Sequence, residues 1–263
     1  MPGCAIITCR ARSTCLIMII LPCSSGGVEE WAGRSLASVG DNPWVVHITV
    51  AVSTSGFLNT CAGSLIDGRW VLTSASCITN ARFIWIRYGA VDRISPQLVT
   101  ELTNVRQFIT HPEYDAATGQ NDIALLDINR YVLNPPNSAI QPVALATDGA
   151  DLPKSAKFCN FGIDDTGAPG DVLSCVDVAP SAKEDGSISA DAESTEFDVG
   201  APLVQDGVQY GILTKVGESS GFLNPAAYLD WIQEVTGVQF GSDNDGDNVV
   251  VPDNEGLPIN FVN

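Results

Sequence analysis

Short apolar segments separated by turn residues run through most of this chain and predict strands rather than long helices. The segments with the composition or the two-residue alternation of strands are residues 44–50, 64–66, 69–73, 83–88, 104–109, 123–127, 172–178, 201–205 and 208–214. Asp67-Gly68 and Asp206-Gly207 have the sequence of tight hairpin turns between neighbouring strands. Such regular spacing is typical of a closed barrel or a sandwich, so we predict an all-β fold.

One segment has the pattern of a helix instead. Residues 224–235 place apolar side chains at helical spacing from Tyr228 to Val235. Pro225 suits the first turn of a helix, and Gly237 suits the position just after its end. The sequence therefore predicts a single helix close to the end of the strand-rich region.

The beginning of the chain has the composition of an export signal. Arg10 and Arg12 precede an apolar run at residues 15–21, and small residues follow at 23–26. This order is typical of a secretory signal peptide, which we assign to residues 1–25. The apolar run is too short to span a bilayer, so we expect a secreted, extracellular protein with no membrane anchor.

The end of the chain is acidic. Residues 241–263 contain acidic side chains and no basic one, so we interpret them as a disordered tail that follows a folded domain at 26–240. An Asp-x-Asp-x-Asp triplet begins at Asp243 with the spacing of a calcium loop. Asn248 stands where such a loop needs glycine, and Asn254 where it needs glutamate, so a solubilising tail is the preferred interpretation.

The charge balance limits the possible partners. Asp and Glu number 31 against 13 Lys and Arg, a formal net charge of -18. A nucleic-acid-binding protein needs the opposite balance, because phosphate contacts come from basic side chains. The chain has 2 His, so we expect neither a His-rich metal site nor a cofactor. A protein partner would present a basic surface, and its binding would weaken with salt.

The cysteines fall into two groups of different fate. Those in or beside the predicted signal peptide leave with it: Cys4, Cys9, Cys15 and Cys23. Those in the folded domain are Cys61, Cys77, Cys159 and Cys175. An even number suits two disulfides in a secreted protein, and three pairings are possible. None of them has the Cys-x-x-Cys spacing of a zinc site.

Several segments carry a resemblance to a known family. The residues from Cys61 to Cys77 read CAGSLIDGRWVLTSASC, residues 121–126 read NDIALL, and residues 197–204 read FDVGAPLV. His111-Pro112-x-Tyr114 and the helix segment at 228–232 follow in the same pattern. Over about residues 40–240, the chain resembles the chymotrypsin/trypsin family of serine proteases.

The resemblance implies a fold and two disulfides. The family fold consists of two perpendicular six-stranded antiparallel β-barrels with a binding cleft between them and a C-terminal helix outside. Cys61–Cys77 corresponds to a family disulfide. Cys159 is then expected on the strand next to Cys175, which makes Cys159–Cys175 the second pair.

The catalytic positions that the resemblance implies hold unsuitable residues. The family triad needs a hydroxyl nucleophile, an imidazole base and a carboxylate that orients the imidazole. The base position holds Ser76 and the nucleophile position holds Val199, so only the carboxylate, Asp122, remains. His47 and His111 lie in other segments, and we interpret both as structural or surface residues.

The surroundings of the nucleophile position differ from the family as well. The oxyanion hole corresponds to the amides of Phe197 and Val199, and Phe197 replaces a glycine. In the family, cleavage after an Arg or Lys frees a terminus whose ammonium pairs with the aspartate beside the nucleophile. Arg34 is not followed by the usual tetrad, so we expect Asp198 to reach water or backbone donors within a mobile, zymogen-like segment.

The specificity pocket and the orienting carboxylate complete the site. Glu193 stands near the pocket base with Thr214 and Val216 in its wall, and Val216 is expected to narrow the mouth. The alternative for Glu193 is a solvated loop acid. Hydroxyls of Thr214 and Ser76 are expected to hydrogen-bond Asp122 in place of an imidazole.

These observations favour a secreted, catalytically inactive serine protease homologue, of the kind abundant in arthropods, that binds as a decoy or regulator. Its partner is expected to be an active protease or the substrate of one. Two other classes stay open: a serine endopeptidase with residual activity, and a secreted structural or storage protein. An inactive site cannot itself name a function, so this step rests on family analogy.

Overall fold

A computed structural model describes residues 34–52, 58–132, 139–164 and 166–240. The predicted signal peptide, the acidic tail and the aspartate triplet that begins at Asp243 lie outside these residues. None of the helices in the described segments is long and apolar enough to cross a lipid bilayer.

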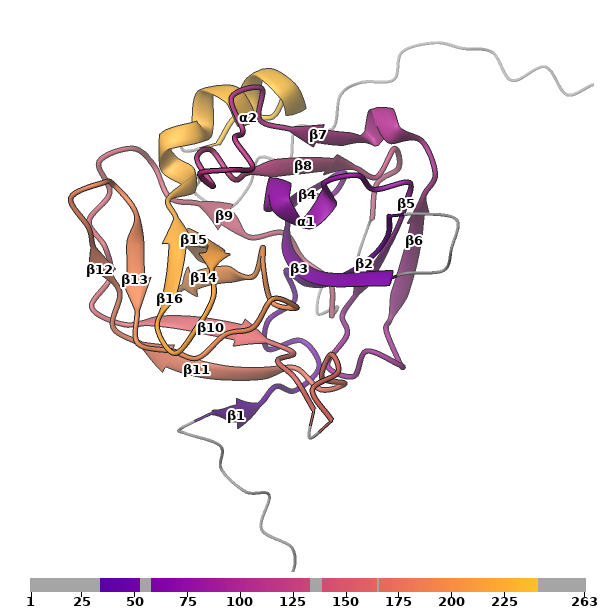
Figure 1. Ribbon diagram of the computed structural model, residues 1–263, viewed down its shortest axis with the longest axis horizontal. Coiled ribbons are helices and arrows are strands. Elements are labelled where there is room, and N and C mark those ends of the chain that lie inside the picture. The colour runs from indigo at the N-terminus through magenta and orange to yellow at the C-terminus, as the bar shows by residue number, and fades with distance from the viewer. Residues whose placement is uncertain (1–33, 53–57, 133–138, 165, 241–263) are drawn as a thin grey trace, which may run out of the picture.

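The first half of the domain forms one curled antiparallel sheet (Figure 1). Its strands, in the order β6-β5-β2-β3-β4-β8-β7, are β6 (Leu98–Leu102), β5 (Phe83–Tyr88), β2 (Val45–Ala51), β3 (Leu58–Asp67), β4 (Trp70–Thr73), β8 (Ala124–Asp127) and β7 (Phe108–Thr110). A short helix, α1 (Ala75–Ile78), follows β4 directly. The residues that fill the inside of the sheet are mostly aliphatic, and they include Ile48, Leu65, Ile86 and Leu126, all fully buried.

The second half forms another curled sheet beside the first (Figure 1). Its strands are β1 (Ser35–Leu36), β11 (Ser174–Val178), β10 (Ala156–Asn160), β14 (Pro202–Gln205), β15 (Val208–Lys215), β16 (Ser220–Leu223), β13 (Ile188–Ala190) and β12 (Ser181–Ala182) in that order, and β9 (Ala144–Leu145) pairs with β15 in parallel. The predicted all-β fold of two antiparallel barrels is confirmed. Short added strands bring the sheets to seven and nine strands.

The predicted helix region is divided in two. A 3₁₀ turn, η2 (Pro225–Tyr228), is capped by the side chain of Asn224 and leads into α2 (Leu229–Thr236). Gly237 ends α2 in the left-handed conformation with φ 71°, as the sequence predicts. Figure 1 shows α2 beside β7 and β8, where Ile232 packs into the core with Ile109.

One predicted strand is wrong in its first half. Residues 104–109 begin with a 3₁₀ turn, η1 (Val105–Gln107), and β7 starts only at Phe108. The side chain of Asn104 accepts a hydrogen bond from the Arg106 amide, and Gln107 completes a capping box. These local side-chain bonds compete with strand pairing, which explains the turn.

Both predicted disulfides are present. Cys61–Cys77 joins β3 to α1, and Cys159–Cys175 joins directly opposed residues of β10 and β11. The first bridge lies beside the segment that carries the predicted base position. Removing a native disulfide from a secreted domain typically costs about 2–5 kcal/mol.

Candidate functional site

The first half of the candidate site is built on α1 and on the loop before β8. Ser74 caps α1 by accepting a hydrogen bond from the Cys77 amide, and this places Ser76 exposed on the first turn. The Ser76 amide donates to Asp122 Oδ1 at 2.7 Å, and its hydroxyl donates to Asp122 Oδ2 at 2.8 Å. The base-position residue and the orienting carboxylate therefore contact each other directly.

Asp122 is held in place from behind. The preceding residue, Asn121, has φ 52°, and its side chain accepts a hydrogen bond from Tyr228 Oη at 2.9 Å. Burial raises the pKa of Asp122, while the two hydrogen bonds from Ser76 oppose this rise. The predicted bond from Thr214 is wrong: the Thr214 hydroxyl reaches only the Gly221 carbonyl, at 3.5 Å. Ser76 alone replaces the imidazole as the side-chain partner of Asp122 among the described residues.

The second half of the site meets the first at Val199. The Val199 carbonyl accepts a hydrogen bond from the Ala62 amide at 2.9 Å, and Ala62 directly follows the bridged Cys61. The next residue, Gly200, has φ +90°, and a Cβ there would lie 2.3 Å from the Ala62 oxygen and from Thr73 Oγ1. The backbone at the nucleophile position is thus pressed against the same stretch of β3 that anchors α1.

The two oxyanion-hole positions remain partly exposed. Phe197 and Val199 are half-buried, and neither of their amides has an acceptor among the described residues. Phe197 keeps a negative φ, so its side chain is accommodated without the left-handed conformation that favours glycine. The side chain at the attacking position is an isopropyl group, which carries no lone pair.

Asp198, between those two residues, is fully buried and hydrogen-bonded. Its Oδ1 accepts from the Gly162 amide at 2.8 Å, and its Oδ2 accepts from the amide and the hydroxyl of Thr195 at 2.9 and 2.8 Å. Burial raises the pKa of Asp198, and these bonds oppose the rise. The expectation of backbone donors is confirmed, and the mobility of this segment stays a prediction.

The two segments expected to form the walls of a specificity pocket, one beside Glu193 and the other after Thr214, are hydrogen-bonded to each other. Ser194 and Gly217 form a β-bridge, with hydrogen bonds of 2.9 and 3.1 Å in the two directions. Ser220, 1% exposed, donates to the Ala192 carbonyl at 2.7 Å and lies 2.8 Å from Ser194 Oγ. These bonds hold the segment at 192–194 against the segment at 217–220. The sequence did not single out Ser194 or Gly217, because the bridge joins residues far apart in the chain.

The predicted pocket residues lie outside an enclosed space. Glu193 is exposed, as in the alternative of a solvated loop acid. Val216 is 42% exposed, so it does not narrow a buried mouth, and Thr214 is half-buried beside Gly221. The closing contacts come from the neighbouring Ser194 and Gly217.

Neither histidine faces the triad positions. His111 packs edge-on against the rings of Tyr228 and Trp231, and its Nδ1 accepts from the Glu113 amide at 3.2 Å. His47 lies on β2 with its ring edge-on to Phe161, the residue after β10 of the other sheet, and neither of its nitrogens has a hydrogen-bond partner among the described residues. Burial lowers the pKa of His47 to about 3.

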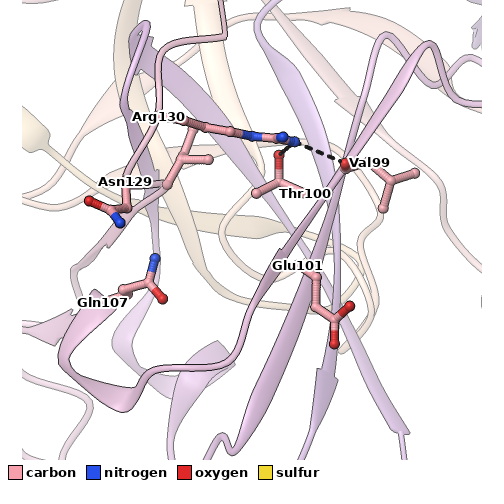
Figure 2. A pocket seen from close by; sticks show the side chains of 7 residues that line it. Val99, Thr100, Glu101, Gln107, Asn129 and Arg130 are labelled. Carbon is pink, nitrogen blue, oxygen red and sulfur yellow. Dashed lines mark hydrogen bonds between the residues drawn. The ribbon is translucent and has the colours of Figure 1, made fainter. Parts of the chain in front are cut away.

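A surface hollow of about 480 Å³ lies on the first sheet, away from these residues. Figure 2 shows Arg130 in this hollow, with its guanidinium bonded to the Val99 carbonyl and the Thr100 hydroxyl at 3.2 and 2.9 Å. Glu101 and Gln107 also line it. Because Arg130 is occupied by these bonds and a carboxylate lies nearby, the hollow presents no ready site for an anion. No group of three metal-ligating side chains occurs in the part of the chain that the structure describes.

A sequence profile of the family described as Trypsin matches residues 32–232. The chain belongs to the trypsin family of serine proteases. The match spans both sheets and every residue of the candidate site described above. The family membership that the motifs indicate is thereby confirmed.

Relatives and solved structures agree with this assignment. The chain is 27% identical to chymotrypsin of Phaedon cochleariae over 73% of this chain and 76% of that protein. It is 30% identical to brachyurin of Leptuca pugilator over 68% of this chain and 88% of that protein. A solved structure described as HL collagenase shares the fold with a TM-score of 0.67 at 22% identity, over 78% of this chain and 98% of that one.

Proposed function

We propose that this chain is a secreted, catalytically inactive member of the trypsin family that acts by binding another protein. The observation that carries the proposal is the pair of residues at the reacting positions. Val199 offers no attacking atom, and Ser76, which donates its proton to Asp122, is no base near neutral pH. A peptide bond placed in the cleft would meet neither a nucleophile nor an imidazole.

The bonded pocket walls support the same proposal independently. A protease selects substrates by enclosing a side chain next to the scissile bond, and this requires space between the walls. The Ser194–Gly217 bridge and the buried hydroxyl of Ser220 fill that space with hydrogen bonds. Opening the walls would break the two backbone hydrogen bonds of the bridge and the Ser220–Ser194 hydroxyl bond, each worth about 0.5–1.5 kcal/mol net.

The partner we propose is a protein with a basic surface, either an active protease or the substrate of one. A formal charge of -18 attracts such a surface over a distance and speeds association. The family shape supplies a protease-like exterior without turnover. This combination suits a decoy, a cofactor or a regulator.

Catalysis is tested with a fluorophosphonate probe and a panel of fluorogenic peptides. We expect no labelling and no turnover, with an active trypsin at the same concentration as the positive control. The double substitution Ser76→His with Val199→Ser is expected to stay inactive, because Phe197 and the bonded pocket walls remain. Labelling of the wild-type chain at Ser76 would overturn the proposal.

The competing candidate is an active serine endopeptidase, and it is favoured by the names of the relatives, which include chymotrypsin, brachyurin and trypsin. The two candidates differ in one measurable property. Activity that copurifies with the chain and disappears in Ser76→Ala would establish the peptidase. Activity that is unchanged in this variant would come from a contaminant.

Binding is tested by capture from the native extracellular fluid at about 0.05 M and at about 0.5 M salt, concentrations at which screening differs strongly. We expect a basic protein that is retained at low salt and lost at high salt. Capture of nothing at either concentration would favour the third class, a structural or storage protein. The heat-unfolded chain, which keeps the charge but loses the shape, serves as the control.

A further inference from the structure

The side chain of Arg34 is docked against the second sheet. Its Nη1 donates to Asn160 Oδ1 at 2.7 Å, and its Nη2 donates to the Glu193 carbonyl at 3.2 Å. The guanidinium carbon lies 5.6 Å from the centre of the Phe158 ring, within the range of a cation–π contact. Arg34, the first residue that the structure describes, is thus bonded to β10 and to the loop before the nucleophile position.

These contacts brace both segments that hold Asp198. Asn160 lies two residues before Gly162, whose amide donates to Asp198 Oδ1. Glu193 lies two residues before Thr195, which donates twice to Asp198 Oδ2. Arg34 therefore fixes the strand on one side of the buried carboxylate and the loop on the other.

The charge of Arg34 complements that of Asp198. No direct ion pair joins them among the described residues, but their opposite charges attract across the shared segments. This attraction raises the pKa of Arg34 against the larger lowering that burial causes. A buried carboxylate is stabilised by a nearby cation as well as by hydrogen bonds, so the arginine contributes to keeping Asp198 charged.

The backbone that follows Arg34 is held in the same sheet. Ser35 pairs with Cys175 and Leu36 with Ser174, and the Ala37 amide donates to the Leu173 carbonyl at 3.0 Å. Figure 1 shows this strand, β1, along β11. A protease that cleaves after arginine must take the arginine side chain into its own pocket, and here both side chain and backbone are already engaged.

In place of the mobile segment that the sequence suggests, we propose that Arg34 is a built-in counter-ion and brace that orders the segment from Glu193 to Val199 in the uncut chain. The ordering of this site is then independent of cleavage after Arg34. The family arrangement described above uses a new terminal ammonium near the corresponding aspartate, and here a side chain supplies the cation instead. This proposal does not rest on whether the cleft is catalytic.

Hydrogen–deuterium exchange of the full chain tests the brace. Arg34→Ala is expected to raise the exchange rates of the Thr195, Asp198 and Gly162 amides at least tenfold, with β2 unchanged. Arg34→Lys keeps the charge but cannot reproduce both hydrogen bonds, so an intermediate rise is expected. Arg106→Ala, at an exposed arginine in η1, is the matched control and should change none of these amides. Unchanged exchange in Arg34→Ala would overturn the proposal.

Limited digestion with trypsin tests the protection from cleavage. The exposed Lys183 is expected to be cut at least tenfold faster than Arg34 in the wild-type chain. Asn160→Ala removes one acceptor of Arg34 and leaves the arginine in place, so it should speed cleavage after Arg34 specifically. This variant also serves if Arg34→Ala fails to fold. Cleavage of the wild-type chain after Arg34 as fast as after Lys183 would contradict the inference.

Discussion

The two halves of the candidate site differ from the family motifs in different ways. In the first sheet, Asp122 is positioned by Asn121 and Tyr228, and the change is confined to Ser76, which bonds the carboxylate directly. In the second half, the Asp198 side chain accepts hydrogen bonds from Gly162 and Thr195, and a β-bridge between Ser194 and Gly217 joins the two pocket walls. The first half differs from the family motif in a side chain, whereas in the second half backbone hydrogen bonds join the segments expected to form the pocket.

This difference indicates in which half of the site a catalytic side chain could be introduced more easily. An imidazole could in principle be returned to position 76, because the carboxylate that would orient it is in place. A nucleophile returned to position 199 would still face a closed pocket, a phenylalanine at 197 and walls joined by backbone hydrogen bonds. Under the proposed function, the second sheet is therefore the larger obstacle to introducing peptidase activity.

The largest expected effect comes from the junction where the halves meet. Gly200→Ala places a methyl group 2.3 Å from the Ala62 oxygen at φ +90° and should lower the free energy of unfolding by about 3–5 kcal/mol. Gly186→Ala, at φ +79° with nothing within 4 Å of the added Cβ, is the control and should cost about 1–2 kcal/mol. Equal losses in urea unfolding would show that the junction is not tightly packed.

His47, which spans the interface between the sheets, should make the protein sensitive to acid. Burial lowers its pKa from 6.5 to about 3, so the folded state excludes a proton that the unfolded state binds. The contribution of neutral His47 to the free energy of unfolding is fully present above pH 6.5 and is lost as the pH falls. The loss at pH 4 is about 3 kcal/mol.

His47→Leu removes this sensitivity and two buried nitrogens without partners. The free energy of unfolding of the wild type and of the variant is measured at pH 7 and at pH 4, and the two proteins are compared at each pH. Because both proteins contain Asp122 and Asp198, the contributions of these carboxylates cancel in the difference. A difference that does not change with pH would show that folding leaves the pKa of His47 unshifted.

The two buried carboxylates should respond differently to loss of charge. In Asp198→Asn, the new NH₂ would face the Gly162 amide or the Thr195 amide, and a backbone donor cannot reverse, so we expect a loss of about 2 kcal/mol. In Asp122→Asn, the amide oxygen keeps the Ser76 N–H while the Ser76 hydroxyl rotates to accept, so the change should stay within about 1 kcal/mol. Thermal unfolding of both variants measures the contrast, and a larger loss for Asp122→Asn would reverse the comparison.

The smallest expected effect is at Ser76. Ser76→Ala removes the 2.8 Å hydroxyl bond to Asp122 but keeps the backbone bond, so a loss of about 1 kcal/mol is expected. Thr214→Val is the control and should be near neutral, because the Thr214 hydroxyl makes only a 3.5 Å contact. A greater loss for Thr214→Val in urea unfolding would contradict the assignment of Ser76 as the carboxylate's partner.

Local patterns in the sequence predicted much of the fold. Turn residues and apolar alternation located β5 and the hairpins at Asp67 and Asp206, and Gly237 marked the end of α2. The strand β6 was not predicted, because Thr100, a polar residue, occupies a buried position in it. Its alternation is therefore hidden from hydrophobic periodicity.

Site residues could be predicted from the sequence only where they fall within a family motif. Ser76, Asp122 and Val199 follow from the family segments, and the Ser76 contact follows from their proximity. The docking of Arg34 and the Ser194–Gly217 bridge depend on partners far along the chain. No local propensity signals such contacts, so they emerge only from the folded structure.

The central claim, that the cleft performs no covalent chemistry, is tested most directly by amide and ester turnover of the purified wild-type chain beside Asp122→Asn. We predict that the wild type shows no hydrolysis above the variant across the peptide panel. Hydrolysis by the wild type that Asp122→Asn abolishes, with contaminating proteases excluded, would contradict the account.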